Sequence, residues 1–190
     1  MRYIYTFLAA IILAACAVSP QVVVVNPEIN VAAAGNAQPV SVSVEVVDTR
    51  NSKVIGQRGG ISSKTSDIST DENMTAALEG KVGGALGQLG YTVVEKGKPA
   101  HVSLTVTITN LSYVANYEHD TLQNIETKLE IRIVGKKNDR EFTGNYTITN
   151  KKDVFLMPSE LDNEVIVNKV FTSVLENMLK DQDLHSFIQG

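Results

Sequence analysis

The sequence is poor in the residue types on which most enzymes and metal sites depend. It has no tryptophan, one cysteine and three histidines among 190 residues. One cysteine cannot form a disulfide within the chain, and His101, His119 and His185 lack the spacing of paired metal ligands. Because aromatic residues make up only 6% of the chain, a stacking or sugar-binding surface is also disfavoured. We expect no metal and no cofactor.

Motifs that present phosphates or nucleophiles are missing as well. No G-x-G-x-x-G, Walker or G-x-S-x-G pattern occurs. Glu118-His119-Asp120 is the one local group of acid and base residues, and it lies between two predicted strands. A general base also needs a nucleophile and a positioned reactant, so we interpret this group as a solvated loop. The sequence therefore predicts a protein that is not an enzyme.

Charge excludes another class of function. The chain has 17 basic and 21 acidic residues and a formal net charge of −4. A mildly acidic chain without a basic patch is a poor match for nucleic acid, which binds through phosphate neutralisation. Glu126, Lys128, Glu130 and Arg132 alternate along one predicted strand. Such a ladder is either a docking surface or a solvated sheet face, and we favour the second.

The N-terminal residues have the layout of a secretory signal. Arg2 supplies a positive charge, residues 7–13 are apolar, and small residues precede Cys16. The apolar run over residues 3–18 has 16 residues. A helix that spans a bilayer needs ~20, so a retained transmembrane helix is disfavoured.

Leu13-Ala14-Ala15-Cys16 resembles the lipobox of bacterial lipoproteins. The resemblance implies cleavage between Ala15 and Cys16, an S-diacylglycerol group on the Cys16 thiol and an N-palmitoyl group on the new N-terminus. Ala17 stands where an inner-membrane retention signal has aspartate. This implies the outer membrane, with the protein on its periplasmic face. Several acyl chains anchor firmly, at ~0.8 kcal/mol per buried CH₂.

The rest of the chain is long enough for one domain with its own core. We expect a signal peptide over residues 1–15, a lipidated N-terminus and tether over 16–39, and a single periplasmic domain over 40–190. Three prolines and a run of small residues mark the tether. Within it, residues 22–25 are either an edge strand or an extended spacer.

Alternation of apolar and polar residues predicts a sheet. The loop between its second strand and the first helix is expected over residues 62–70, which are polar and lack periodicity. The predicted strands cover residues 40–46, 53–58, 91–94, 101–111, 125–133 and 142–148. Where their direction can be inferred they are antiparallel, so we expect a largely antiparallel sheet of about five to six strands.

Two helices are expected to cover one face of this sheet. The first runs over residues 74–89 with Thr70 or Asp71 as its cap, and the second over 159–180. A final turn near Leu184 and Phe187 packs beneath the sheet edge. The predicted fold class is α+β, a two-layer sandwich.

The first predicted helix contains Gly80, Gly83, Gly84 and Gly87, each of which costs up to ~1 kcal/mol relative to alanine. Their G-x-x-x-G spacing indicates either a contact with another helix or a close approach to the sheet. Lys81 and the acids before the helix disfavour a lipid-embedded helix. We favour the close approach to the sheet.

Five features of the chain recur together in one family. They are the lipobox, Asp48-x-Arg50 followed by Ile55-Gly56, a helix ending Leu89-Gly90-Tyr91, the long strands from Val102 onward and the closing Asp181…Leu184…Phe187-Ile188. In these features the chain resembles the YajG family of uncharacterised bacterial lipoproteins. The resemblance implies an outer-membrane lipoprotein with a periplasmic domain and no assigned activity or catalytic residue. On their own, Asp48 and Arg50 predict a turn with a surface ion pair.

Two functions remain open. The first is a non-enzymatic lipoprotein that binds or scaffolds another envelope component through its sheet face or an exposed edge. The alternative is a carrier or sensor of an apolar ligand such as a lipid, held between the two helices and the sheet. The expected partners are the membrane, through the anchor, and an envelope protein, but not nucleic acid. A hydrolase of envelope polymers has no support beyond the predicted location.

Overall fold

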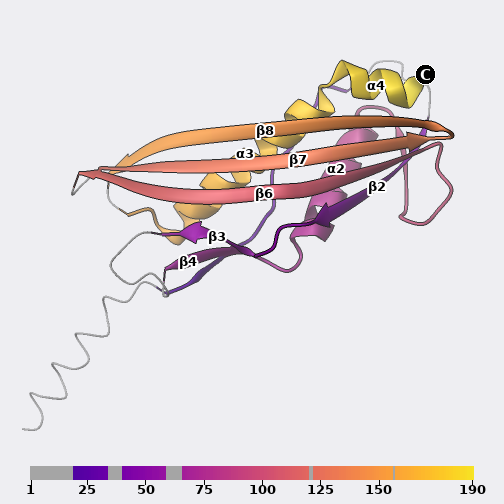
Figure 1. Ribbon diagram of the computed structural model, residues 1–190. Coiled ribbons are helices and arrows are strands. Elements are labelled where there is room, and N and C mark those ends of the chain that lie inside the picture. Colours follow the sequence, from indigo (N-terminus) through magenta and orange to yellow (C-terminus); the bar gives the residue numbers. More distant parts are fainter. Residues whose placement is uncertain (1–18, 34–39, 59–65, 120–121, 156) are drawn as a thin grey trace, which may run out of the picture.

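The computed structural model describes residues 19–33, 40–58, 66–119, 122–155 and 157–190, which form a sheet of eight strands and three helices (Figure 1). The strands are β1 (Gln21–Val23), β2 (Ser41–Asp48), β3 (Val54–Gln57), β4 (Asp67–Thr70), β5 (Thr92–Val94), β6 (Val102–His119), β7 (Leu122–Lys137) and β8 (Arg140–Phe155). The helices are α2 (Met74–Gln88), α3 (Glu160–Leu179) and α4 (Gln182–Gln189).

The sheet is mixed, so the expected antiparallel sheet of five to six strands is wrong. Its order is β1-β4-β3-β6-β2-β5, with β7 and then β8 added on the other edge of β6. Four of the seven strand pairs are parallel: β1 with β4, β2 with β5, β2 with β6, and β3 with β6. Each parallel pair joins strands separated by other strands or by α2. Alternation within one strand carries no information on the direction of such a distant neighbour.

The largest part of the sheet is a ribbon of three long antiparallel strands, β6, β7 and β8. β6 continues past its predicted end. A bulge at Thr109 shifts the register of β6 against β7. The buried side chains of β6 therefore change from even positions up to Ile108 to odd positions from Leu111. Thr109 Oγ1 donates to the carbonyl of Glu130 at 3.1 Å and holds the bulge.

The helices cover one face of the sheet, but there are three among the described residues rather than the two expected (Figure 1). α3 begins as predicted, with Ser159 and Asp162 forming a reciprocal capping box. α2 differs, since its cap residue is Asn73 and Thr70 ends β4. The predicted final turn is α4, which buries Leu184, Phe187 and Ile188.

The chain that precedes β2 packs on the domain. β1 pairs with β4, which supports the edge-strand interpretation of residues 22–25 and adds a strand in the predicted loop over 62–70. After β1, residues 24–31 continue as an extended strap. Its inward side chains are Val25, Pro27, Ile29 and Val31, and the residues between them are exposed.

Side chains of neighbouring elements bind the backbone of this strap. Asn168 of α3 accepts a hydrogen bond from Asn26 N and donates one to the carbonyl of Val24. Asp71 accepts from Val25 N at 3.0 Å, and Glu176 of α3 accepts from the backbone of the strap at 3.0 Å. Polar side chains thus replace the strand partner that this extended segment lacks.

Candidate functional site

The two histidines whose side chains the structure describes have different hydrogen-bond partners. His101 Nδ1 lies 2.6 Å from Ser41 Oγ. His185 has other partners and lies between the Tyr91 hydroxyl and the carbonyl of Leu179, each at 2.7 Å. Across the part of the chain that the structure describes, no three His, Cys, Asp or Glu side chains come together to hold a metal ion.

Several predicted site residues lie outside this description. Asp120 and the lipidation residues Ala15 and Cys16 are not among the described residues, and the side chains of Glu118 and His119 are not described. Within the described ranges, no helix is long and apolar enough to cross a bilayer. The charge ladder of β7 lies on the sheet face away from the core, and Lys128 pairs there with Glu130 at 2.6 Å.

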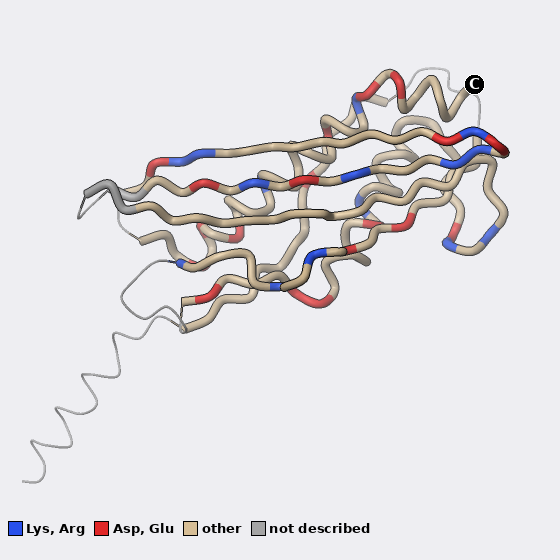
Figure 2. Tube along the Cα trace, in the orientation of Figure 1, with Lys and Arg blue, Asp and Glu red and all other residues tan. Residues whose placement is uncertain are grey.

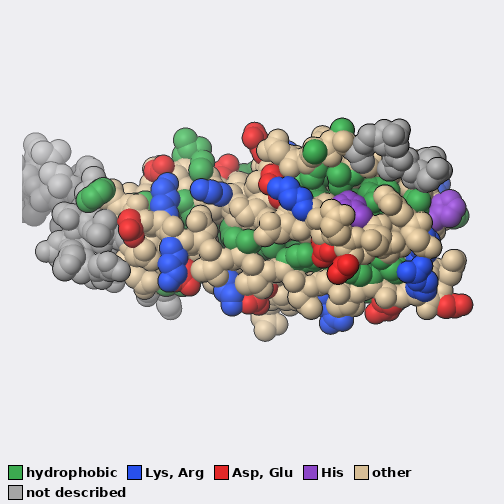
Figure 3. Space-filling view, turned by 90° about the horizontal axis from the view of Figure 1, so that it is seen from above, with side chains coloured by type: hydrophobic (Ala, Val, Ile, Leu, Met, Phe, Trp, Pro, Cys, Tyr) green, Lys and Arg blue, Asp and Glu red, His purple; other side chains and the backbone are tan. Residues whose placement is uncertain are grey.

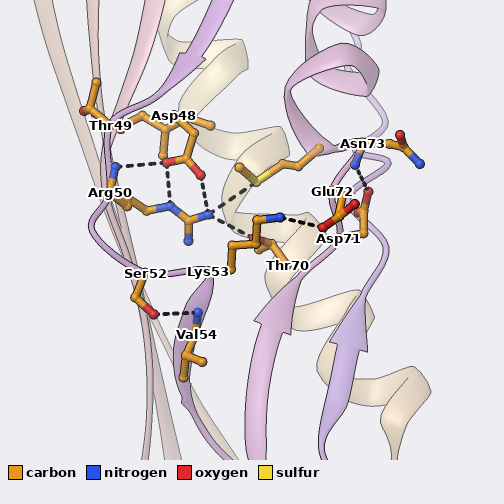
Figure 4. Close-up of polar contacts among 12 residues, drawn as sticks. Asp48, Thr49, Arg50, Ser52, Lys53, Val54, Thr70, Asp71, Glu72 and Asn73 are labelled. Atoms are coloured by element: carbon orange, nitrogen blue, oxygen red, sulfur yellow. Dashed lines mark hydrogen bonds and ion pairs between the residues drawn. The ribbon is translucent and has the colours of Figure 1, made fainter.

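The most connected polar group surrounds Asp48 and Arg50 at the end of β2 (Figure 4). Arg50 Nε and Nη2 donate to the two carboxylate oxygens of Asp48, both at 2.8 Å. Nη2 also donates to Thr70 Oγ1 at 2.9 Å and lies 3.8 Å from the sulfur of Met74. One guanidinium therefore connects the end of β2, the end of β4 and the start of α2.

This ion pair is partly buried, so it is less exposed than the predicted surface ion pair. The exposed fractions are 6% for the Arg50 side chain and 21% for the Asp48 side chain, and Arg50 Nη1 has no hydrogen-bond partner among the described residues. Burial alone raises the pKa of Asp48, but hydrogen bonds from Arg50 and its charge outweigh burial and hold that pKa below its ordinary value. A partly buried, bidentate pair that also bonds Thr70 is suited to holding these three elements together.

A shallow groove of about 570 Å³ lies between α2, Val44 of β2 and the β5 edge. Gly80, Gly84 and Gly87 line it, and a Cβ added at any of them would meet no atom within 4 Å. Only Gly83 approaches the sheet, where an added Cβ would lie 3.4 Å from Val93. The predicted close approach of these glycines to the sheet is therefore wrong for three of the four.

The space between α2 and α3 is filled by the strap. Glu28 and Asn30 lie beside α2 on one side and beside α3 on the other. Val25 is buried in the core, and Ile29 and Val31 pack against it. The chain itself thus occupies the position expected for an apolar ligand between the helices and the sheet.

β8 presents a long edge that no strand covers. Its 16 residues pair with β7 in unbroken register, and no other described strand pairs with it. The charges of β8 lie at its two ends, and residues 142–150 between them are uncharged (Figure 2). Proteins usually protect such edges with lysine, proline or a bulge, and this stretch has none of them.

A comparison with known protein families identifies the class of this protein. Residues 27–189 match the model of a family described as "Uncharacterized lipoprotein" (Lipoprotein_16). The match spans most of the chain, so the protein belongs to this lipoprotein family. None of the curated proteins compared with the sequence matches it.

Solved structures share the fold. Protein XCC0632 from Xanthomonas campestris is 12% identical with a TM-score of 0.53, over 85% of this chain and 92% of that chain. An uncharacterized protein is 8% identical with a TM-score of 0.50, over 84% of this chain and 97% of that one. A minor lipoprotein from Acinetobacter baumannii is 11% identical with a TM-score of 0.41, over 73% and 87%. The first two similarities show the fold alone.

Asp48→Asn is expected to lower the free energy of unfolding by about 2 kcal/mol at pH 7, because it removes a charged acceptor from buried Arg50. The pKa of Asp48 is lower in the folded than in the unfolded chain. Its stabilising contribution is therefore complete above the ordinary value of 3.8 and is lost as the pH falls through the folded pKa. The measurement is urea unfolding of the wild type and of Asp48→Asn between about pH 3 and about pH 7, a range that extends below and above the ordinary pKa of an aspartate. The difference in free energy of unfolding between the two chains should shrink as the pH falls.

The control is Glu72→Gln, which removes the exposed partner of Lys53 in the same cluster. It should leave the urea midpoint unchanged, since exposed ion pairs contribute little. If both variants shifted the midpoint equally at pH 7, burial of the Asp48–Arg50 pair would not be the cause of its contribution.

Gly80→Ala with Gly84→Ala is expected to raise the free energy of unfolding by about 1 kcal/mol per substitution, because alanine favours the helix and the added methyl groups meet no atom. Gly135→Ala is the matched control, since its Cβ would lie 2.8 Å from Phe187 and should destabilise. Urea unfolding of all variants measures both. If the double variant were less stable than the wild type, the space beside Gly80 and Gly84 would not be open.

Proposed function

We propose that this protein is an outer-membrane lipoprotein, anchored by acyl chains on Cys16, whose periplasmic domain binds another envelope protein and catalyses no reaction. Membership of the lipoprotein family supports membrane anchoring. The lipobox at residues 13–16 and the Ala17 that follows it support the position of the anchor and the outer membrane. The finer likeness to the YajG family is part of the same proposal.

The single observation that carries the binding role is the free edge of β8. The backbone donors and acceptors along this edge are available to an extended segment of another protein, which can add as a further strand. Thr143, Asn145, Thr147 and Thr149 project from the exposed side of β8. Their side chains are small and uncharged, so they leave room for a strand at the edge.

The choice of a binding role over catalysis follows from the polar groups described above. The Asp48–Arg50 pair joins elements of the fold, and His101 and His185 form hydrogen bonds with different partners, Ser41 and Tyr91. The carrier function is less favoured, because the strap fills the space between α2 and α3 and the groove beside the α2 glycines is shallow and open.

Cys16→Ala tests the anchor. The variant should move from the membrane pellet to the soluble fraction of the envelope, and it should keep the far-ultraviolet circular dichroism and urea midpoint of the folded domain. Incorporation of labelled palmitate into the wild-type chain, and its loss in the variant, is the matching chemical measurement. A Cys16→Ala chain that stays with outer membranes in a density gradient would contradict the proposed anchor.

The edge is tested by a photo-reactive residue at Thr149, crosslinked in intact cells. Thr143→Lys with Thr147→Lys places two charges opposite Val134 and Glu130, so neither faces a like charge. These charges should reduce the crosslinked adduct roughly tenfold, which corresponds to about 1.4 kcal/mol of binding.

Asn177→Lys with Ser186→Lys adds the same charge at exposed positions of α3 and α4 instead of on β8, and should leave the adduct unchanged. Equal yields from both double variants would contradict recognition at the β8 edge. Loss of the adduct from both would indicate an effect of net charge instead.

A further inference from the structure

Four large apolar side chains are exposed between the end of β8 and the start of α3. The exposed fractions are 81% for Phe155, 71% for Leu161, 56% for Val165 and 40% for Met157. We name these four residues the apolar corner. Leu161 and Val165 are four residues apart on α3 and so lie on one face of the helix. Figure 3 shows hydrophobic side chains projecting at this end of the molecule, where β8 finishes in Figure 1.

The chain enters the domain at the same place. Gln21, the first residue of β1, is buried, and its Nε2 donates to the carbonyl of Glu160 at 2.7 Å. Asn163 Nδ2 donates to Gln21 Oε1 at 3.0 Å. These two bonds fix the start of β1 against the first turn of α3, beside Leu161.

Covalent geometry then limits the distance to the anchor. Cys16 precedes Gln21 by five residues. A fully extended chain advances at most about 3.6 Å per residue, so Cys16 lies within about 18 Å of Gln21. Acyl chains on Cys16 would therefore hold the apolar corner close to the lipid leaflet that they enter. Val22 and Val24, which are also exposed, lie on the same short stretch of chain.

We propose that the apolar corner is a second membrane contact, in which Phe155 and Leu161 enter the interfacial region of the leaflet that holds the acyl chains. The proposal rests on the proposed anchor at Cys16. Exposed apolar surface within reach of a bilayer gains free energy by leaving water. The anchor keeps the corner at the membrane, so the contact needs little affinity of its own.

The charges near the corner favour apolar insertion over attraction to anionic lipid. Residues 151–165 contain two lysines and four carboxylate side chains. Lys151 pairs with Glu126, and Arg58 pairs with Glu160 beside the corner, each at 3.1 Å, so a carboxylate offsets each of these two cations. A corner without a basic cluster has little attraction for anionic head groups. The contact should therefore form on phosphatidylcholine and persist in high salt.

The chain has no tryptophan, so a single introduced indole reports its own surroundings. We would prepare the full lipidated protein as Phe155→Trp and as Leu161→Trp, in phosphatidylcholine vesicles that contain acyl-brominated phosphatidylcholine. Both variants should show blue-shifted emission that the brominated lipid quenches, with and without added salt. Because both positions are exposed, neither substitution should change the urea midpoint.

Asp139→Trp is the control, in the turn at the opposite end of β8. The 16 residues of β8 span about 50 Å at ~3.3 Å per residue, and the turn is flanked by charged residues. Its emission should stay that of an indole in water and should not be quenched.

The outcomes separate the corner from the anchor. If the protein floats with the vesicles but neither corner variant is quenched, the proposal is overturned and the anchor stands. Blue-shifted emission without quenching by brominated lipid would mean that another protein chain covers the corner, which also overturns it. A lipidated chain that does not float with the vesicles overturns the anchor, and with it this proposal.

Discussion

Asn163 is a fully buried amide on which the arrangement of three parts of this protein depends. Its Oδ1 accepts a hydrogen bond from the Tyr113 hydroxyl of β6 at 2.6 Å, and its Nδ2 donates to Gln21 of β1. A buried amide is costly unless its polar atoms are bonded. The long strand, the first turn of α3 and the entry of the chain are therefore held in one arrangement, which places the start of β1 beside the exposed Leu161.

The strap has a comparable role between the helices. α2 and α3 cover different parts of the sheet, and the extended residues 24–31 complete the layer between them. Asp71 connects the strap to α2. One of its carboxylate oxygens accepts a hydrogen bond from the backbone of the strap, and the other accepts one from the backbone of Asn73 at the start of α2. Among the described residues, the strap therefore fills the space between α2 and α3.

The apolar corner and the edge of β8 differ in kind. The apolar corner is a small hydrophobic surface close to the start of β1. The edge of β8 is instead a row of backbone groups beside uncharged side chains. A membrane suits the first and an extended polypeptide suits the second. The two surfaces meet where β8 ends at Phe155. A domain held at this corner would present the rest of its free edge at increasing distance from the lipid.

Much of the local structure was predictable from residue patterns. Ser159 with Asp162 marks the start of α3, strict alternation over residues 40–46 marks β2, and the apolar residues of the last helix are buried. Val165 shows where residue type alone misleads, since it is an apolar residue of α3 and its side chain is exposed. The packing of the strap could have been predicted from its alternation of residue types. The inward residues of β1 and the strap, which alternate with polar or exposed ones, are Val23, Val25, Pro27, Ile29 and Val31.

The sequence by itself determined where helices and long strands form and where a motif that resembles a lipobox stands, because capping, alternation and signal layout depend on neighbours along the chain. Only the tertiary structure decided the four parallel pairings, the burial of Arg50, the open glycine face of α2 and the exposure of Phe155 and Leu161. Each of these depends on which distant segments pack together, and the same local pattern is compatible with several such packings.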